Sequence, residues 1–126
     1  MIDATVDAAI ESGAQRVGVL AADGCRRARL YQNAFEARGV DAVFLADEAQ
    51  QDFMTLIFRV KAGDVGDDVQ RRMQQLALSL NARGAQAVIA ACTEVPLVLS
   101  SDTLAAPVIS STDALVARAI EFANRN

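Results

Sequence analysis

Apolar and polar residues alternate along this chain in blocks that predict helices and strands in turn. Four short apolar runs predict strands at Arg16 to Ala21, Asp41 to Ala46, Ala87 to Ala91 and Pro107 to Ser110. The runs are continuous rather than alternating, which favours a parallel sheet covered on both faces. Helices are expected around Val6 to Ile10, at Arg26 to Arg38, and as a pair over residues 48–83 that is broken at Gly63-Asp64-Val65-Gly66.

Each predicted helix carries one apolar stripe with residues three and four apart, so each should pack on one side. The stripes are Val6, Ala9 and Ile10; Ala28, Tyr31 and Phe35; Phe53, Ile57 and Val60; and Val69, Met73, Leu76 and Leu80. A glycine also stands four positions before a valine at three places, Gly13, Gly39 and Gly84. Because glycine readily takes the left-handed conformation that closes a helix, these positions predict three joints from helix to strand.

Composition limits the chain to one domain of ordinary size. It has 126 residues, of which 52% are hydrophobic and 22% charged, and only 5% are aromatic, so the core should be aliphatic. The net charge is −4 and the arginines form no basic stripe, which argues against nucleic acid as a partner. No apolar run has membrane-spanning length, and Met1 to Ala4 does not resemble a signal peptide. We therefore expect a cytoplasmic protein with no membrane partner.

The chain contains no histidine and only two cysteines, Cys25 and Cys92. This excludes Ser-His-Asp and Cys-His nucleophiles, a disulfide scaffold and a zinc site, and no metal site is expected. Acid and base chemistry must come from Cys, Asp, Glu, Lys or Tyr. Cys92 follows a buried strand and precedes an expected short helix, whose N-terminus would lower the thiol pKa. A buried cysteine that acts only as a small hydrophobe is the alternative interpretation.

In a parallel sheet the loops after the strands meet at one edge, where ligands bind in open α/β folds. Here these loops are Ala22-Asp23-Gly24-Cys25, Asp47-Glu48, Cys92-Thr93-Glu94 and Ser110-Ser111-Thr112. Helix capping is the simpler role for Asp47, Ser111 and Thr112. Asp23-Gly24 predicts a turn, and the lone glycines form no phosphate-binding loop. Lys61 ends a predicted helix, where a cation balances the helix dipole.

Several segments, taken in order, resemble the second half of the aspartate/glutamate racemase family. They are 20–25 (Leu-Ala-Ala-Asp-Gly-Cys), 30–31 (Leu-Tyr), 60–64 (Val-Lys-Ala-Gly-Asp), 83–97 with Cys-Thr-Glu at its centre, and 107–113. The resemblance implies a flavodoxin-like three-layer α/β lobe with a four-stranded parallel sheet, one of two lobes in a racemase. It also implies an isomerase that uses no PLP or other cofactor, with one cysteine from each lobe flanking a small amino-acid or dicarboxylate substrate.

Carried over residue by residue, the resemblance makes Cys92 the acid/base residue of this lobe. Lys61 matches the family lysine that helps hold a substrate carboxylate, and Thr93 would offer its N–H and hydroxyl. Asp23, Gly24 and Glu94 belong to the same substrate-binding segments. Cys25 stands where the family usually has threonine, so this chain departs from the family at that contact.

The resemblance treats residues 1–126 as one lobe, with helices at 1–13 and 113–126 that would join a first lobe. Removing a proton from one face of a carbon and returning one to the other needs two groups, so a homodimer is one way to supply the second thiol. Three alternatives stay open: a non-catalytic lobe or fragment that binds a small carboxylate, a pairing of Cys25 with Cys92 within one chain, and a receiver-type signalling module. A receiver module would need a phosphoacceptor aspartate after the third strand, where this chain has Cys92.

Overall fold

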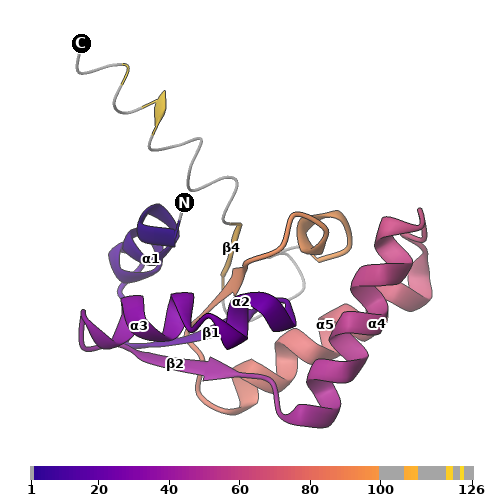
Figure 1. Ribbon diagram of the computed structural model, residues 1–126, viewed down its shortest axis with the longest axis horizontal. Coiled ribbons are helices and arrows are strands. Elements are labelled where there is room, and N and C mark those ends of the chain that lie inside the picture. Colours follow the sequence, from indigo (N-terminus) through magenta and orange to yellow (C-terminus); the bar gives the residue numbers. More distant parts are fainter. Residues whose placement is uncertain (1, 100–106, 111–118, 121–122, 124–126) are drawn as a thin grey trace.

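A four-stranded parallel sheet forms the centre of the computed structural model, which describes residues 2–99, 107–110, 119–120 and 123 (Figure 1). Its strands are β1 (Arg16–Leu20), β2 (Asp41–Phe44), β3 (Ala87–Ala90) and β4 (Val108–Ser110), in the order β2-β1-β3-β4. All four lie within the predicted ranges. The central strands β1 and β3 are almost entirely buried, whereas the edge strands β2 and β4 are partly exposed.

Helices cover both faces of the sheet, which gives three layers (Figure 1). On one face α1 (Ile2–Glu11) and α3 (Leu30–Glu36) pack through Val6 and Phe35 onto Val19 and Ile89. On the other face α4 (Asp47–Lys61) and α5 (Asp67–Ala82) bring Phe53, Met73 and Leu80 onto Val88. Successive residues of each strand point to opposite faces, so the continuous apolar runs fill two cores at once. The prediction of a flavodoxin-like α/β lobe is confirmed.

The predicted joints from helix to strand are confirmed by backbone conformation. Gly13, Gly39 and Gly84 have φ angles of +87°, +69° and +96°, in the left-handed region that other residues rarely adopt. A fourth glycine matters for a different reason. Gly18 lies in β1 beneath α5, where an added Cβ would come within 3.0 Å of the Leu80 Cβ.

The segment after β1 differs from its prediction. Asp23-Gly24, predicted as a turn, begins the short helix α2 (Asp23–Arg27), and α3 follows as a separate helix. The two are divided at Arg29, whose φ of 55° breaks the helical path. Because of this break Ala28 is exposed rather than part of a buried stripe, whereas Tyr31 and Phe35 are buried as predicted.

Two further expectations concern helix ends. Asp47 does not cap α4, because Ala46 occupies the N-cap position and Asp47 is the first helical residue, where its charge favours the dipole. Ser111, Thr112 and most of the helix expected at 113–126 lie outside the described residues. Within the part of the chain that the structure describes, no helix is long and apolar enough to cross a membrane.

Candidate functional site

The carboxyl ends of β1 and β3 bring two separate segments together, Ala21–Cys25 and Ala91–Glu94, which we call the carboxyl edge. Leu20 and Ala90 are register partners, and the Ala91 N–H donates a hydrogen bond of 3.0 Å to the Leu20 carbonyl. Two residues beyond these register partners, the Ala22 N–H donates a hydrogen bond to the Cys92 sulfur. Strand pairing therefore sets the position of this thiol.

Cys92 is partly buried and packs against the core that α4 and α5 form with the sheet. Burial raises the pKa of its thiol, and the charges of Glu94 and Cys25 act in the same direction. The hydrogen bond from Ala22 and the positive charge of Lys61 lower the pKa, but burial is the largest effect. Burial therefore favours the protonated thiol, whereas the Lys61 cation and the Ala22 N–H favour the thiolate.

The expected source of thiolate stabilisation was wrong. The helix after Cys92 is a single 3₁₀ turn, η1 (Val95–Leu97), which begins three residues later. Pro96 lies in its first positions, so few N–H groups are available there. So short a turn has little dipole to offer, and the pKa of Cys92 is raised instead of lowered.

Cys25 lies on α2, partly buried against the core that contains Tyr31 and Phe35. Burial raises the pKa of its thiol, and its charge also acts on Cys92. The two cysteines are 67 positions apart in the sequence and pack against the cores on opposite faces of the sheet, yet the charge of Cys25 acts on Cys92. Both thiols therefore belong to the carboxyl edge, each over a different face of the sheet.

The other residues expected at the site are distributed around this edge. Lys61 is the last residue of α4 and lies over the Phe58 ring, 5.8 Å from its centroid. Glu94 is partly buried, whereas Thr93 and Gly24 are exposed. Asp23 is the first residue of α2. Lys61, Glu94 and Cys25 are close enough to Cys92 for their charges to act on it.

One polar residue at the carboxyl edge was missed by the sequence analysis. Gln50 on α4 is buried, and its Nε2 donates hydrogen bonds of 2.9 Å to the Ala21 carbonyl and to the Asp23 carboxylate. It thus ties α4 to the segment that carries Cys25. Gln50 lies three residues before Phe53 and seven before Ile57, so a polar residue in an apolar stripe was the available signal.

Two cavities lie away from the thiols. One, of about 520 Å³, is lined by residues of α3 and β2 together with Arg16 and Arg83. The other, of about 300 Å³, lies between α4 and α5, where Arg59, Arg71 and Arg72 line it. Among the described residues no group of three or more Cys, Asp or Glu side chains is arranged to hold a metal ion.

Comparison with known proteins places these features in a family context. The model of the Asp/Glu/Hydantoin racemase family matches residues 1–119. A relative from Pectobacterium carotovorum subsp. carotovorum, an uncharacterized protein in the pnlA 3′ region, is 27% identical over 124 residues, which are 97% of this chain and 82% of the relative.

Solved structures share the fold of this chain. The aspartate racemase of Picrophilus torridus is 26% identical, with a TM-score of 0.76 over 98% of this chain and 51% of its own. An aspartate racemase homologue from Pyrococcus horikoshii OT3 is 23% identical, with a TM-score of 0.86 over 98% of this chain and 54% of its own. A Yersinia pestis structure assigned to the Asp/Glu racemases is 21% identical, with a TM-score of 0.88 over 96% and 54%. The chain thus spans about half the length of these structures.

Proposed function

Since the chain belongs to the Asp/Glu/Hydantoin racemase family, we propose that it acts in amino-acid racemisation without PLP, with Cys92 moving the α-proton of an aspartate- or glutamate-type substrate. The observation that carries the proposal is the placement of the Cys92 thiol at the carboxyl edge, with the Ala22 N–H on its sulfur and Lys61 nearby. Family membership supports an isomerase, and the position of the thiol supports its identity as the proton carrier.

The chemistry is balanced by two proton transfers. The Cys92 thiolate takes the proton from the α-carbon, and the electron pair of the broken C–H bond moves onto the substrate carboxylate as an enediolate. A thiol on the opposite face then gives its proton to the carbon, so that the configuration inverts with no net oxidation. Lys61 and backbone N–H groups of the carboxyl edge would stabilise the enediolate. Cations and N–H donors stabilise a developing negative charge most strongly where water is excluded.

We propose that a second copy of this chain supplies the opposing thiol. Cys25 and Cys92 both belong to the carboxyl edge of one lobe, so both would approach a substrate from the same side. A two-fold axis would place the Cys92 of the partner opposite the first, because isologous dimers present the same surface twice. The solved racemases, about twice as long, have room for a second lobe within one chain.

The test is exchange of the α-proton in D₂O, followed by proton NMR with L-aspartate and L-glutamate, together with chiral analysis of the product. Cys92→Ser should reduce exchange and racemisation at least about a hundredfold, because general base catalysis by a positioned group contributes that much. Cys25→Thr, which restores the residue usual in the family, is the matched control and should retain activity. Unchanged exchange in Cys92→Ser contradicts the proposal.

The source of the opposing thiol has its own measurement. If a second copy supplies it, activity per chain should rise with protein concentration over the range in which sedimentation shows dimers to form. Mixing Cys92→Ser with wild-type chains should lower the activity per wild-type chain, since mixed dimers carry a single Cys92. Activity that is independent of concentration in a monomeric sample contradicts the dimer.

A second candidate function is binding of a small carboxylate without turnover. It is favoured by the raised pKa of both thiols, which keeps them protonated near neutral pH. Calorimetry with aspartate and glutamate tests it, with Lys61→Met expected to weaken binding and Arg59→Met, two residues earlier on α4, as the matched control. Binding that depends on Lys61 in a protein that shows no exchange in D₂O supports this candidate over racemisation.

A further inference from the structure

The larger of the two cavities lies along the edge strand β2, and the proposed chemistry does not use it. It measures about 520 Å³, and the consecutive residues 40–44 form one of its walls. Neither cysteine lines it. Three arginines do, Arg16, Arg29 and Arg83, together with the acidic residues Glu36 and Asp41. The balance of these charges indicates which kind of ligand the cavity would favour.

The three arginines differ in how far their charge is balanced. Arg29 forms an ion pair of 2.9 Å with Glu36, and Arg16 lies 3.5 Å from the Asp41 carboxylate, whose side chain is 74% exposed. Arg83 takes part in none of the ion pairs between described residues, and its guanidinium donates to the neutral carbonyl of Phe44. A guanidinium has five N–H donors, of which this carbonyl accepts one. Arg83 therefore brings to the cavity a positive charge with no carboxylate beside it.

Arg16 is held next to Arg83 by contacts with the backbone. Its Nη1 donates a hydrogen bond of 3.2 Å to the Arg83 carbonyl, although the two residues are 67 positions apart. The following Gly84 leaves room for this contact, because a Cβ there would lie 2.8 Å from the Arg16 Nη1. The Arg16 N–H also donates to the Gln86 Oε1 at 3.2 Å. Both arginines are thus held in place by the fold, which reduces the entropy that a ligand must remove on binding.

We propose that this cavity binds a small organic anion, a carboxylate or a phosphate monoester, whose charged group meets Arg83 and Arg16. Guanidinium groups suit such anions because their N–H donors match two anionic oxygens at once. The apolar residues Val43 and Phe44 line the same cavity and would contact the apolar part of the ligand. Because the site contains neither cysteine, it does not depend on the proposed racemisation.

Isothermal titration calorimetry at low ionic strength tests this site with phenyl phosphate, benzoate and inorganic phosphate. One or both of the aromatic anions should bind more tightly than inorganic phosphate, and the tighter of the two identifies the preferred charged group. Arg83→Met should weaken binding about tenfold, because a hydrogen bond to a charged group is strong. Asp41→Asn should strengthen binding about two- to threefold, because it removes an exposed carboxylate that competes for Arg16.

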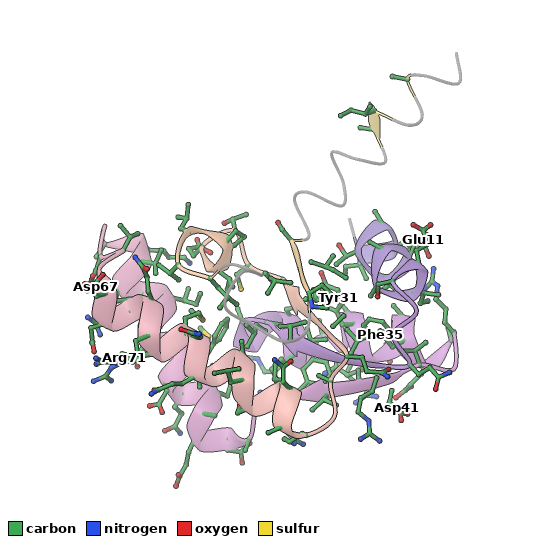
Figure 2. All side chains as sticks on the ribbon, turned by 180° about the vertical axis from the view of Figure 1, so that it is seen from behind. Glu11, Tyr31, Phe35, Asp41, Asp67 and Arg71 are labelled. Carbon is green, nitrogen blue, oxygen red and sulfur yellow. The ribbon has the colours of Figure 1, made fainter. Side chains whose placement is uncertain are left out.

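Arg71→Met is the matched control, because Arg71 lines the other arginine-rich cavity, between α4 and α5. Figure 2 shows Arg71 and Asp41 on opposite sides of the lobe. Arg71→Met should bind the probes as tightly as wild type does. Binding that is lost in Arg71→Met and kept in Arg83→Met would place the anion in the other cavity and overturn the proposal.

Two further outcomes contradict the site. One is the absence of measurable binding for all three probes in the wild-type chain. The other is weaker binding in Asp41→Asn, since this variant keeps the hydrogen bond from Arg83 to Phe44 and changes only the charge beside Arg16. The opposite signs expected for Arg83→Met and Asp41→Asn therefore separate an effect of charge from a loss of folded structure.

Discussion

The side-chain amide of Gln50 lies 2.9 Å from the Asp23 carboxylate, which joins α4 to the first residue of α2 across 27 positions of sequence. The same Nε2 also donates to the Ala21 carbonyl at 2.9 Å. A buried amide that bonds twice to one segment fixes that segment closely. Gln50 thereby sets where the carboxyl edge begins and where the helix that carries Cys25 points.

Replacing Gln50 by Met should therefore destabilise the protein and loosen the carboxyl edge. The variant leaves the Ala21 carbonyl without its amide donor, and a lost partner of a buried polar group costs about 1–3 kcal/mol. Urea unfolding measures the change in the free energy of unfolding. Gln51→Met, on the exposed side of the same helix, is the control and should stay within about 0.5 kcal/mol of wild type. Equal stability of the two variants would contradict the role of Gln50.

The contact between β1 and α5 predicts that Gly18 tolerates no side chain. A Cβ at this position would come within 3.0 Å of Leu80 and 3.2 Å of the Ala85 Cβ, so Gly18→Ala should cost about 1–3 kcal/mol through overpacking. Gly24→Ala is the matched variant, because nothing lies within 4 Å of its added Cβ and its backbone is helical. It should be neutral or more stable by about 0.5–1 kcal/mol. Chemical unfolding of both proteins should separate them clearly, and a neutral Gly18→Ala would show that α5 can move away.

Stability should fall at alkaline pH because of the carboxyl-edge thiols and Tyr31. Burial raises the pKa of Cys25 and Cys92 above the ordinary value of 9.0, and that of Tyr31 above 10.0. The unfolded chain thus loses these protons first, so their stabilising contribution is complete below about pH 9 and is lost as pH rises through the folded pKa values. Melting temperatures should therefore be constant at neutral pH and decline above about pH 9. A Cys25→Ser, Cys92→Ser double variant should show a shallower decline, and parallel curves would contradict the assignment.

Arg59 should stabilise the connection between α4 and α5 in a way that depends on pH and salt. It makes ion pairs of 2.8 Å with Asp64 and 3.0 Å with Asp68, and the pKa of both carboxyls is lowered. Asp64 is held first by the Gly66 N–H and then by Arg59, whereas Arg59 is the largest influence on Asp68. A lowered carboxyl pKa contributes stability above the ordinary value of 3.8 that disappears as pH falls through the folded value.

Arg59→Met should therefore melt at a lower temperature than wild type near neutral pH, with a difference that narrows toward pH 3 and at high ionic strength. Differential scanning calorimetry at several pH values measures this. Arg71→Met is the comparison, because Arg71 is 67% exposed and pairs with Asp68 from within α5, so a smaller effect is expected. A difference between Arg59→Met and wild type that persists unchanged at acid pH would show that the ion pairs are not its source.

The sequence by itself determined the layers of this protein. Strand positions and the glycine joints at Gly13, Gly39 and Gly84 follow from local rules, since apolar runs need burial and a left-handed φ favours glycine over other residues. It also placed Cys92 and Cys25 at one edge, because parallel strands end at a common edge, whereas Lys61 was assigned to the site only through the family resemblance.

Only the tertiary structure decided the hydrogen-bond partners of these groups and the direction in which the pKa of Cys92 is shifted. The amide of Gln50 has the spacing of a core residue, and its polar end meets the carboxyl edge only once α4 packs on the sheet. The direction of the Cys92 pKa was likewise hidden, because burial by distant segments outweighs the short turn that follows it in the chain. Local pattern specifies elements, whereas desolvation and hydrogen bonding depend on which elements come together.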